Sequence, residues 1–175
     1  GNADRILVLR SDDAVGMLEV ANGRAFLHSR RDPEEIVTAI DLATGKIAWQ
    51  QKYSAGFTKN QYATAMAKGP NSTPLVAGNR LFTLGVTGIL TAWNVADGTI
   101  AWRGGNHGYY STPVVADRRL LGLNEKGSLA VVAATPAGYQ ELAQNQLVVE
   151  PTWTSPAVVG NRLYIRSRTG LACFE

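Results

Sequence analysis

The sequence is poor in the residues from which most catalytic and metal sites are built. Its 175 residues include one cysteine, Cys173, and two histidines, His28 and His107. A single cysteine excludes a disulfide within the chain, and Cys173 stands in an apolar, strand-like run where we expect it to be buried. The two histidines are not spaced as a metal site. We therefore predict no metal site and no catalytic residues.

Long apolar runs and a large excess of one charge are also missing. No window approaches the roughly 18 apolar residues of a membrane helix, so we predict no membrane span. The formal net charge is +3, and the 17 Lys and Arg residues are spread along the chain, which argues against nucleic-acid binding. The first residues do not read as a signal peptide; Gly1 is typical of a tag remnant, and we presume that a secretion signal has been removed.

Glycine is abundant by contrast, with 18 residues, and short runs of Val, Ile, Leu and Thr predict an all-β fold. One segment recurs along the chain. It occurs at 72–82 (STPLVAGNRLF), 111–121 (STPVVADRRLL) and 154–164 (TSPAVVGNRLY), with a weaker copy at 18–26 (LEVANGRAF). With Leu18, Pro74, Pro113 and Pro156 taken as equivalent positions, the copies are 56, 39 and 43 residues apart. A period near 40 residues with a hairpin at a fixed offset is typical of a propeller blade.

We therefore predict one β-propeller domain over residues 1–175, built from about four blades of four antiparallel strands. The blades are expected at about 16–53, 72–103, 111–143 and 154–175. The last copy stops after its third strand, and residues 5–10 (RILVLR) are the candidate fourth strand that closes this blade. The ring then closes on itself with four blades, or two chains pair by two-fold symmetry into eight, or the chain is a shortened relative that lost middle blades.

A second motif ends the repeat. Residues 38–49 (TAIDLATGKIAW) match 91–102 (TAWNVADGTIAW) position for position. The Thr-Gly or Asp-Gly pair predicts a tight turn between the third and fourth strands. The following Trp is expected to lie over this turn and over the small Ala ten residues earlier, and to seal neighbouring blades. The predicted blade-sealing residues are Ala39, Gly45, Trp49, Ala92, Gly98 and Trp102.

These residues resemble the quinoprotein-like (PQQ-like) propeller repeat, whose blades read much like Ala-x-Asp-x-x-Thr-Gly-x-x-x-Trp. The resemblance implies a propeller and leaves the chemistry open, because the superfamily includes both dehydrogenases and assembly scaffolds. Its dehydrogenases hold pyrroloquinoline quinone and calcium. The acidic pairs here, Asp12-Asp13 and Glu34-Glu35, lack the spacing of a calcium loop, and we expect Glu34-Glu35 to lie in a solvated turn. We predict no cofactor, and PQQ with calcium is disfavoured.

A ligand would bind where propellers carry their longest loops, at the entrances to the first strands and between the second and third strands. Aromatic, amide and cationic side chains in these loops suit a sugar or a peptide segment. The aromatic groups could instead only fill the central channel. The predicted ligand-binding residues are Lys59, Tyr62, Asn106, His107, Tyr109, Tyr110 and Trp153.

Together these features predict a non-enzymatic binding or scaffold module of the PQQ-like propeller type. We expect it to be exported to the periplasm or the extracellular space. Its partner would be a protein, a small molecule or a glycan, and it would be a monomer or a two-fold dimer. A quinone-dependent, dehydrogenase-like protein and a carbohydrate-binding propeller are the alternatives.

Overall fold

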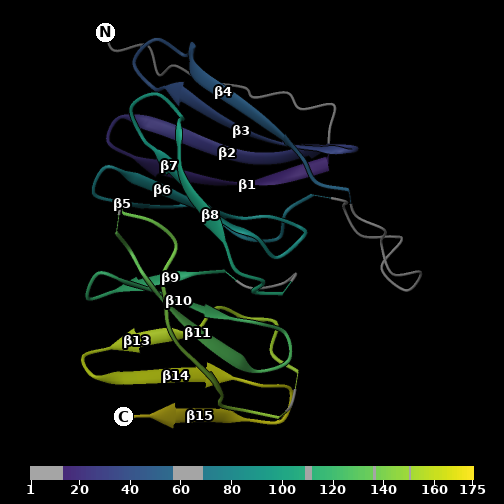
Figure 1. Cartoon of the computed structure of the whole chain (residues 1–175), viewed down its shortest axis with the longest axis vertical. Coiled ribbons are helices and arrows are strands. Elements are labelled where there is room, and N and C mark those ends of the chain that lie inside the picture. The colour runs from purple at the N-terminus through teal and green to yellow at the C-terminus, as the bar shows by residue number, and fades with distance from the viewer. Residues whose placement is uncertain (1–13, 57–68, 109–111, 136, 150) are drawn as a thin grey trace, which may run out of the picture.

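The structure is a computed structural model, and it describes residues 14–56, 69–108, 112–135, 137–149 and 151–175. These residues form strands, turns and loops and no helix, and so they include no helix that could cross a membrane. The strands form four antiparallel sheets that follow one another along the chain (Figure 1). The predicted all-β fold of repeated antiparallel blades is confirmed.

Each sheet is a meander in which consecutive strands are neighbours. The first sheet comprises β1 (Ala14–Ala21), β2 (Arg24–Arg31), β3 (Glu34–Asp41) and β4 (Ile47–Ser54). The second comprises β5 (Leu75–Ala77), β6 (Arg80–Leu84), β7 (Leu90–Asn94) and β8 (Ile100–Gly104). The third comprises β9 (Val114–Ala116), β10 (Arg119–Leu123), β11 (Ser128–Ala133) and β12 (Glu141–Gln146). The fourth has three described strands, β13 (Ala157–Val159), β14 (Arg162–Arg166) and β15 (Leu171–Phe174).

Two-residue turns join the first two strands of each sheet, as the repeated segment predicts. Asn22 and Gly23 both have positive φ, at 53° and 72°, which suits a hairpin that follows the twist of its strands. Gly78 and Gly160 begin the corresponding turns of the second and fourth sheets, with φ of 59° and 60°. These turns fix the strand register, and with it the face on which each side chain lies.

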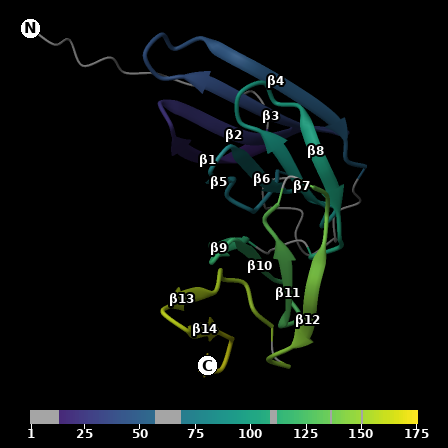
Figure 2. The same ribbon diagram turned by 60° about the vertical axis from the view of Figure 1, so that its left-hand side comes forward.

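The four sheets lie in an open row and do not close into a ring. The first and fourth sheets lie at opposite ends of this row (Figure 1). Figure 2 shows β1, β5, β9 and β13 along one side of the row and β4, β8 and β12 along the other. The described residues therefore do not form a ring that this chain closes alone. The predicted closing strand, residues 5–10, lies outside the described residues.

Apolar cores fill the spaces between neighbouring sheets. Phe26 and Val37 of the first sheet pack against Leu81 and Trp93 of the second. The second and third sheets share a core around Phe82, Trp102 and Leu120, and the third and fourth share one around Leu123, Leu129 and Ile165. The second and third sheets thus each use one face for the preceding sheet and the other for the following sheet.

Three local expectations are wrong. Glu35 does not lie in a solvated turn, because β3 begins at Glu34 and the Glu35 side chain is fully buried between sheets. Cys173 is exposed rather than buried, because nothing among the described residues covers the outer face of β15. The fourth strand of the third sheet continues to Gln146, beyond the expected end of this blade at 143.

Candidate functional site

The loops predicted to carry the binding site lie at one end of the sheets. Because the strands are antiparallel, the connections after the second and the fourth strand of each sheet leave from the same end. We call this the loop-bearing end; its described loops include 85–89, 105–108, 124–127, 147–149 and 151–156. Of the seven predicted ligand-binding residues, Asn106, His107 and Trp153 are described. The other four, Lys59, Tyr62, Tyr109 and Tyr110, lie outside the described residues.

The three described residues differ in exposure. Asn106 is exposed, and Trp153 is 68% exposed. His107 is only 5% exposed, and its backbone N–H donates to Gly88 O at 2.8 Å, which anchors the loop to the β6–β7 turn. Asn106 and Trp153 can therefore contact a partner directly, whereas His107 supports the loop that carries Asn106.

The His107 ring belongs to a polar cluster between the second and third sheets. Its Nε2 lies 3.2 Å from the Tyr139 hydroxyl, and this hydroxyl donates to Glu141 Oε2 at 2.8 Å. Burial lowers the pKa of His107 below its usual value of 6.5, and the nearby Glu141 charge opposes this shift only in part. His107 is therefore held as a neutral imidazole at neutral pH.

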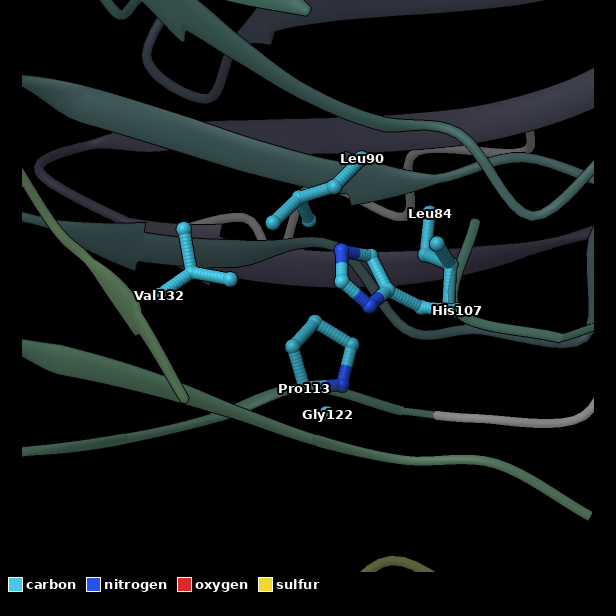
Figure 3. A pocket seen from close by; sticks show the side chains of 6 residues that line it. All are labelled: Leu84, Leu90, His107, Pro113, Gly122 and Val132. Atoms are coloured by element: carbon cyan, nitrogen blue, oxygen red, sulfur yellow. The ribbon is translucent and has the colours of Figure 1, made fainter. Parts of the chain in front are cut away.

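His107 also lines a small apolar cavity (Figure 3). The cavity measures about 10 Å³, which is room for one water molecule and for no organic cofactor. Leu84 and Leu90 come from the second sheet, and the third sheet and its entry supply the rest of the lining. The remaining lining residues are Pro113, Gly122 and Val132.

A second polar cluster, which we did not predict from the sequence, lies between the first and second sheets. The Tyr53 hydroxyl donates to Glu35 Oε2 at 2.5 Å, and the backbone N–H of Val86 donates to Glu35 Oε1 at 2.7 Å. His28 Nε2 lies 3.1 Å from the Tyr53 oxygen and 3.6 Å from Glu35 Oε2. The Arg103 guanidinium lies over the Tyr53 ring, 4.5 Å from its centroid. Both oxygens of Glu35 are therefore engaged inside the protein.

The charge of Glu35 is stabilised by these neighbours. Burial alone would raise the pKa of the carboxyl, but His28, the Tyr53 hydroxyl and the Val86 N–H together hold it below its usual value. Burial and the adjacent Glu35 charge raise the pKa of Tyr53, which keeps its hydroxyl proton. Gly85 leaves the space that this contact needs, because a Cβ there would overlap Glu35 Oε2. The contact from β3 to Val86 joins the first two sheets.

The predicted blade-sealing residues lie at the opposite end of the same cores. Trp49 pairs with Ala39 across β3 and β4, and its Nε1–H donates to Val95 O of the next sheet at 2.9 Å. A Cβ on Gly98 would lie 2.5 Å from the Trp49 ring, so only glycine lets the next turn fit beneath it. Gly45 has a φ of 71° in the corresponding turn of the first sheet.

Trp102 repeats this arrangement one sheet further along. It pairs with Ala92, and its Nε1–H donates to Thr135 O of the third sheet at 2.7 Å. Phe82 and Tyr139 flank the indole, with ring centroids 5.8 and 5.7 Å away. The third sheet has no Trp at the matching place. In this sheet β12 is exposed along its whole length.

The described residues do not fit a quinone and calcium site. Calcium requires six or more oxygen ligands that converge on one point. Glu34 and Glu35 are neighbours on a strand, so their side chains point to opposite faces, and Glu35 already uses both its oxygens. Within the described ranges no three His, Cys, Asp or Glu side chains are grouped to hold a metal ion. Asp12 and Asp13 lie outside those ranges.

The comparison with protein families shows to which family the chain belongs. The family described as outer membrane protein assembly factor BamB matches residues 33–137, which is more than half of the chain. The chain belongs to this family of PQQ-like propeller repeats. Its two complete Trp motifs, at 38–49 and 91–102, both lie within the matched segment. No curated protein matches the sequence.

Solved structures share the fold at low sequence identity. BamB from Moraxella catarrhalis is similar at a TM-score of 0.64 and 17% identity, over 87% of this chain and 46% of BamB. The chain thus spans about half the length of this relative. The computationally designed Ika4 protein is similar at 0.71 and 12% identity, over 98% of both chains. A europium-containing methanol dehydrogenase is similar at 0.53 and 18% identity, over 79% of this chain and 24% of the enzyme.

Proposed function

We propose that this chain is a non-enzymatic binding or scaffold module that holds a segment of another protein at its loop-bearing end. The family match, whose description is an assembly factor for outer membrane proteins, makes an outer-membrane protein the natural class of partner. The same description supports export to the periplasm or beyond. The methanol dehydrogenase shares only the fold, and so it lends no activity to this chain.

The proposal rests on the burial and the hydrogen bonds of Glu35. This carboxylate is fully buried, and its two oxygens accept hydrogen bonds from Tyr53 and from the backbone of Val86. A general base must reach a substrate proton, and a metal ligand must be reachable by the ion. Glu35 meets neither requirement and instead links two sheets. The groups most suited to chemistry thus stabilise the scaffold.

The exposed side chains at this end include an aromatic group and an amide group. Trp153 offers a large apolar ring, and Asn106 offers a donor and an acceptor. Such a pair suits an extended peptide, whose backbone amides and alternate side chains present both kinds of surface. A strand segment of an outer-membrane β-barrel protein has this chemistry.

Intrinsic fluorescence tests the proposal, because the four Trp residues differ in exposure. Trp49, Trp93 and Trp102 are 8%, 1% and 6% exposed, whereas Trp153 is 68% exposed. A synthetic peptide that carries one strand of an outer-membrane β-barrel protein should shift the emission of Trp153 to shorter wavelength in a saturable way. Trp153→Phe should abolish the shift. Leu42→Ala, on an exposed apolar residue of the opposite end, should leave it unchanged.

Two results would count against the proposal. One is a spectrum that stays unchanged at all peptide concentrations. The other is a saturable change in the absorbance of pyrroloquinoline quinone that requires calcium, because it would support the dehydrogenase-like alternative. A fluorescence shift with oligosaccharides and not with the peptide would favour the carbohydrate-binding alternative.

A further inference from the structure

Arg103 places a positive charge where the repeat does not require one. Strand pairing puts Gln50 and Gln144 at the matching positions of the first and third sheets, and both are neutral. Arg103 is exposed near the end of β8, and Asn106 follows it three positions later in the connection that leaves this strand. The Arg103 side chain therefore belongs to the loop-bearing end, where we propose that a peptide binds.

The residue opposite Arg103 lacks the contact that its counterpart in the first sheet has. In the first sheet Gln50 donates its amide N–H to Thr38 Oγ1 at 2.9 Å across the strand pair. Thr91 stands opposite Arg103 in the same way, but its hydroxyl is fully buried and has no hydrogen-bond partner among the described residues. A buried hydroxyl without a partner lowers stability, and a local defect of this kind is typical of a functional position.

The Arg103 side chain instead turns to the first sheet. Its guanidinium carbon lies 4.5 Å from the centroid of the Tyr53 ring. This ring is itself fixed, because its hydroxyl donates to Glu35 Oε2 and lies 3.1 Å from His28 Nε2. None of the guanidinium N–H groups donates to another described residue. Stacking therefore holds the flat face of the group in place and leaves its hydrogen-bonding edge free.

A guanidinium held in this way suits a carboxylate ligand. Its edge offers parallel N–H groups that match the two oxygens of a carboxylate, and stacking on an aromatic ring fixes the group before the ligand arrives. Glu35, the buried acid of this cluster, does not take that place, since its two oxygens accept hydrogen bonds from Tyr53 and Val86. The ligand must therefore come from outside the cluster.

We propose that Arg103 binds a carboxylate of the partner peptide, supplied by an acidic side chain or by the peptide C-terminus. This inference rests on the proposed function and adds a specificity-determining residue to it. The module then selects among peptides by charge as well as by apolar contacts. A neutral residue at this position, as in the first and third sheets, would not hold the anion.

Calorimetric titration with a matched set of peptides tests the proposal. All share one strand sequence of an outer-membrane β-barrel protein; each position in turn is Glu or Gln, and each peptide has a free or an amidated C-terminus. The wild-type chain should bind a carboxylate-bearing peptide about three- to tenfold more tightly than its neutral counterpart. The pair that shows this difference identifies whether the carboxylate is a side chain or the C-terminus. Arg103→Gln should remove the difference.

Arg103→Gln also separates binding from folding. Its amide can donate to Thr91 Oγ1 as Gln50 donates to Thr38, so the melting temperature should stay the same or rise while the preference is lost. Lys52→Met is the matched control. Lys52 is an exposed cation that precedes Tyr53 on β4, and its side chain points to the opposite face of the sheet, so its loss should keep the preference.

The possible failures are distinct. Equal binding of acidic and neutral peptides, or a preference that survives Arg103→Gln, would overturn the role of Arg103 and leave the proposed function standing. A preference lost equally in Lys52→Met would also overturn it, since net charge would then account for the effect. A wild-type chain that binds none of the peptides would overturn both proposals.

Discussion

Trp102 shows how a single side chain can connect two sheets of this molecule. It is 6% exposed, packs between Phe82 and Tyr139, and donates its one N–H to Thr135 O across the gap. An indole buried in this way supplies a large apolar area and satisfies its single polar group at the same time. Loss of the ring would leave a cavity and an unpaired carbonyl together.

We predict that Trp102→Ala lowers the free energy of unfolding by about 3–5 kcal/mol, the usual cost of such a cavity. Chemical denaturation monitored by circular dichroism measures the change. Trp153→Ala is the matched control, because that ring is 68% exposed and its loss should change stability by less than about 1 kcal/mol. Equal losses for the two variants would mean that Trp102 does not seal the sheets.

Removal of the Tyr53 hydroxyl tests, in a similar way, how much the buried Glu35 carboxylate depends on its donors. Tyr53→Phe removes one of the two donors to Glu35, and a buried acceptor left unpaired costs about 1–3 kcal/mol. Tyr139→Phe removes a hydroxyl that lies 3.2 Å from His107 Nε2 and donates to Glu141, which is exposed and can bind water instead. Urea titrations should therefore show a clearly larger loss for Tyr53→Phe. The reverse order would contradict the role given to Glu35.

At the scale of elements, the connection between β8 and β9 couples the second and third sheets through His107. Because burial lowers the pKa of His107 in the folded chain, the unfolded chain binds its proton more readily. The stability that this residue provides is complete above pH 6.5 and is lost as the pH falls below that value. Acid should therefore loosen this connection before most carboxylates are protonated.

The pH dependence of unfolding between pH 7.5 and about 5.5 measures this effect. We predict that His107→Gln flattens the slope of stability against pH by up to about 1.4 kcal/mol per pH unit, since one titrating proton is removed. Asp97→Asn is the control, because the hydrogen bonds from Thr99 lower the pKa of Asp97 and place its titration below this range. A slope that His107→Gln leaves unchanged would refute the assignment.

Local elements could be predicted from the sequence and long-range contacts could not. The turns at Asn22-Gly23 and Gly98 and the pairing of Trp49 with Ala39 depend on residues close in the chain, so a repeated pattern reveals them. The Glu35 contact joins residues 51 positions apart, and no local pattern distinguishes it from a solvated acid. The exposure of Cys173 likewise depends on whether another sheet covers the fourth one, and the residues of β15 do not determine this.

At the scale of the whole molecule, the open row of sheets separates two kinds of surface. The outer face of the fourth sheet exposes Leu171 and Val159, and the loop-bearing end carries Asn106 and Trp153. His107 and Glu35 lie beneath the latter and join neighbouring sheets. A partner can therefore bind at the loops while the scaffold beneath stays unchanged.

Hydrogen exchange measured by mass spectrometry, with and without the outer-membrane strand peptide, tests this account most directly. It reports every described loop in one experiment, on the unmodified chain. The account predicts slower exchange at residues 105–108 and 151–156 in the presence of the peptide, and unchanged exchange in the turns at 42–46 and 95–99. Protection confined to those opposite turns, or to the exposed strand β12, would contradict it.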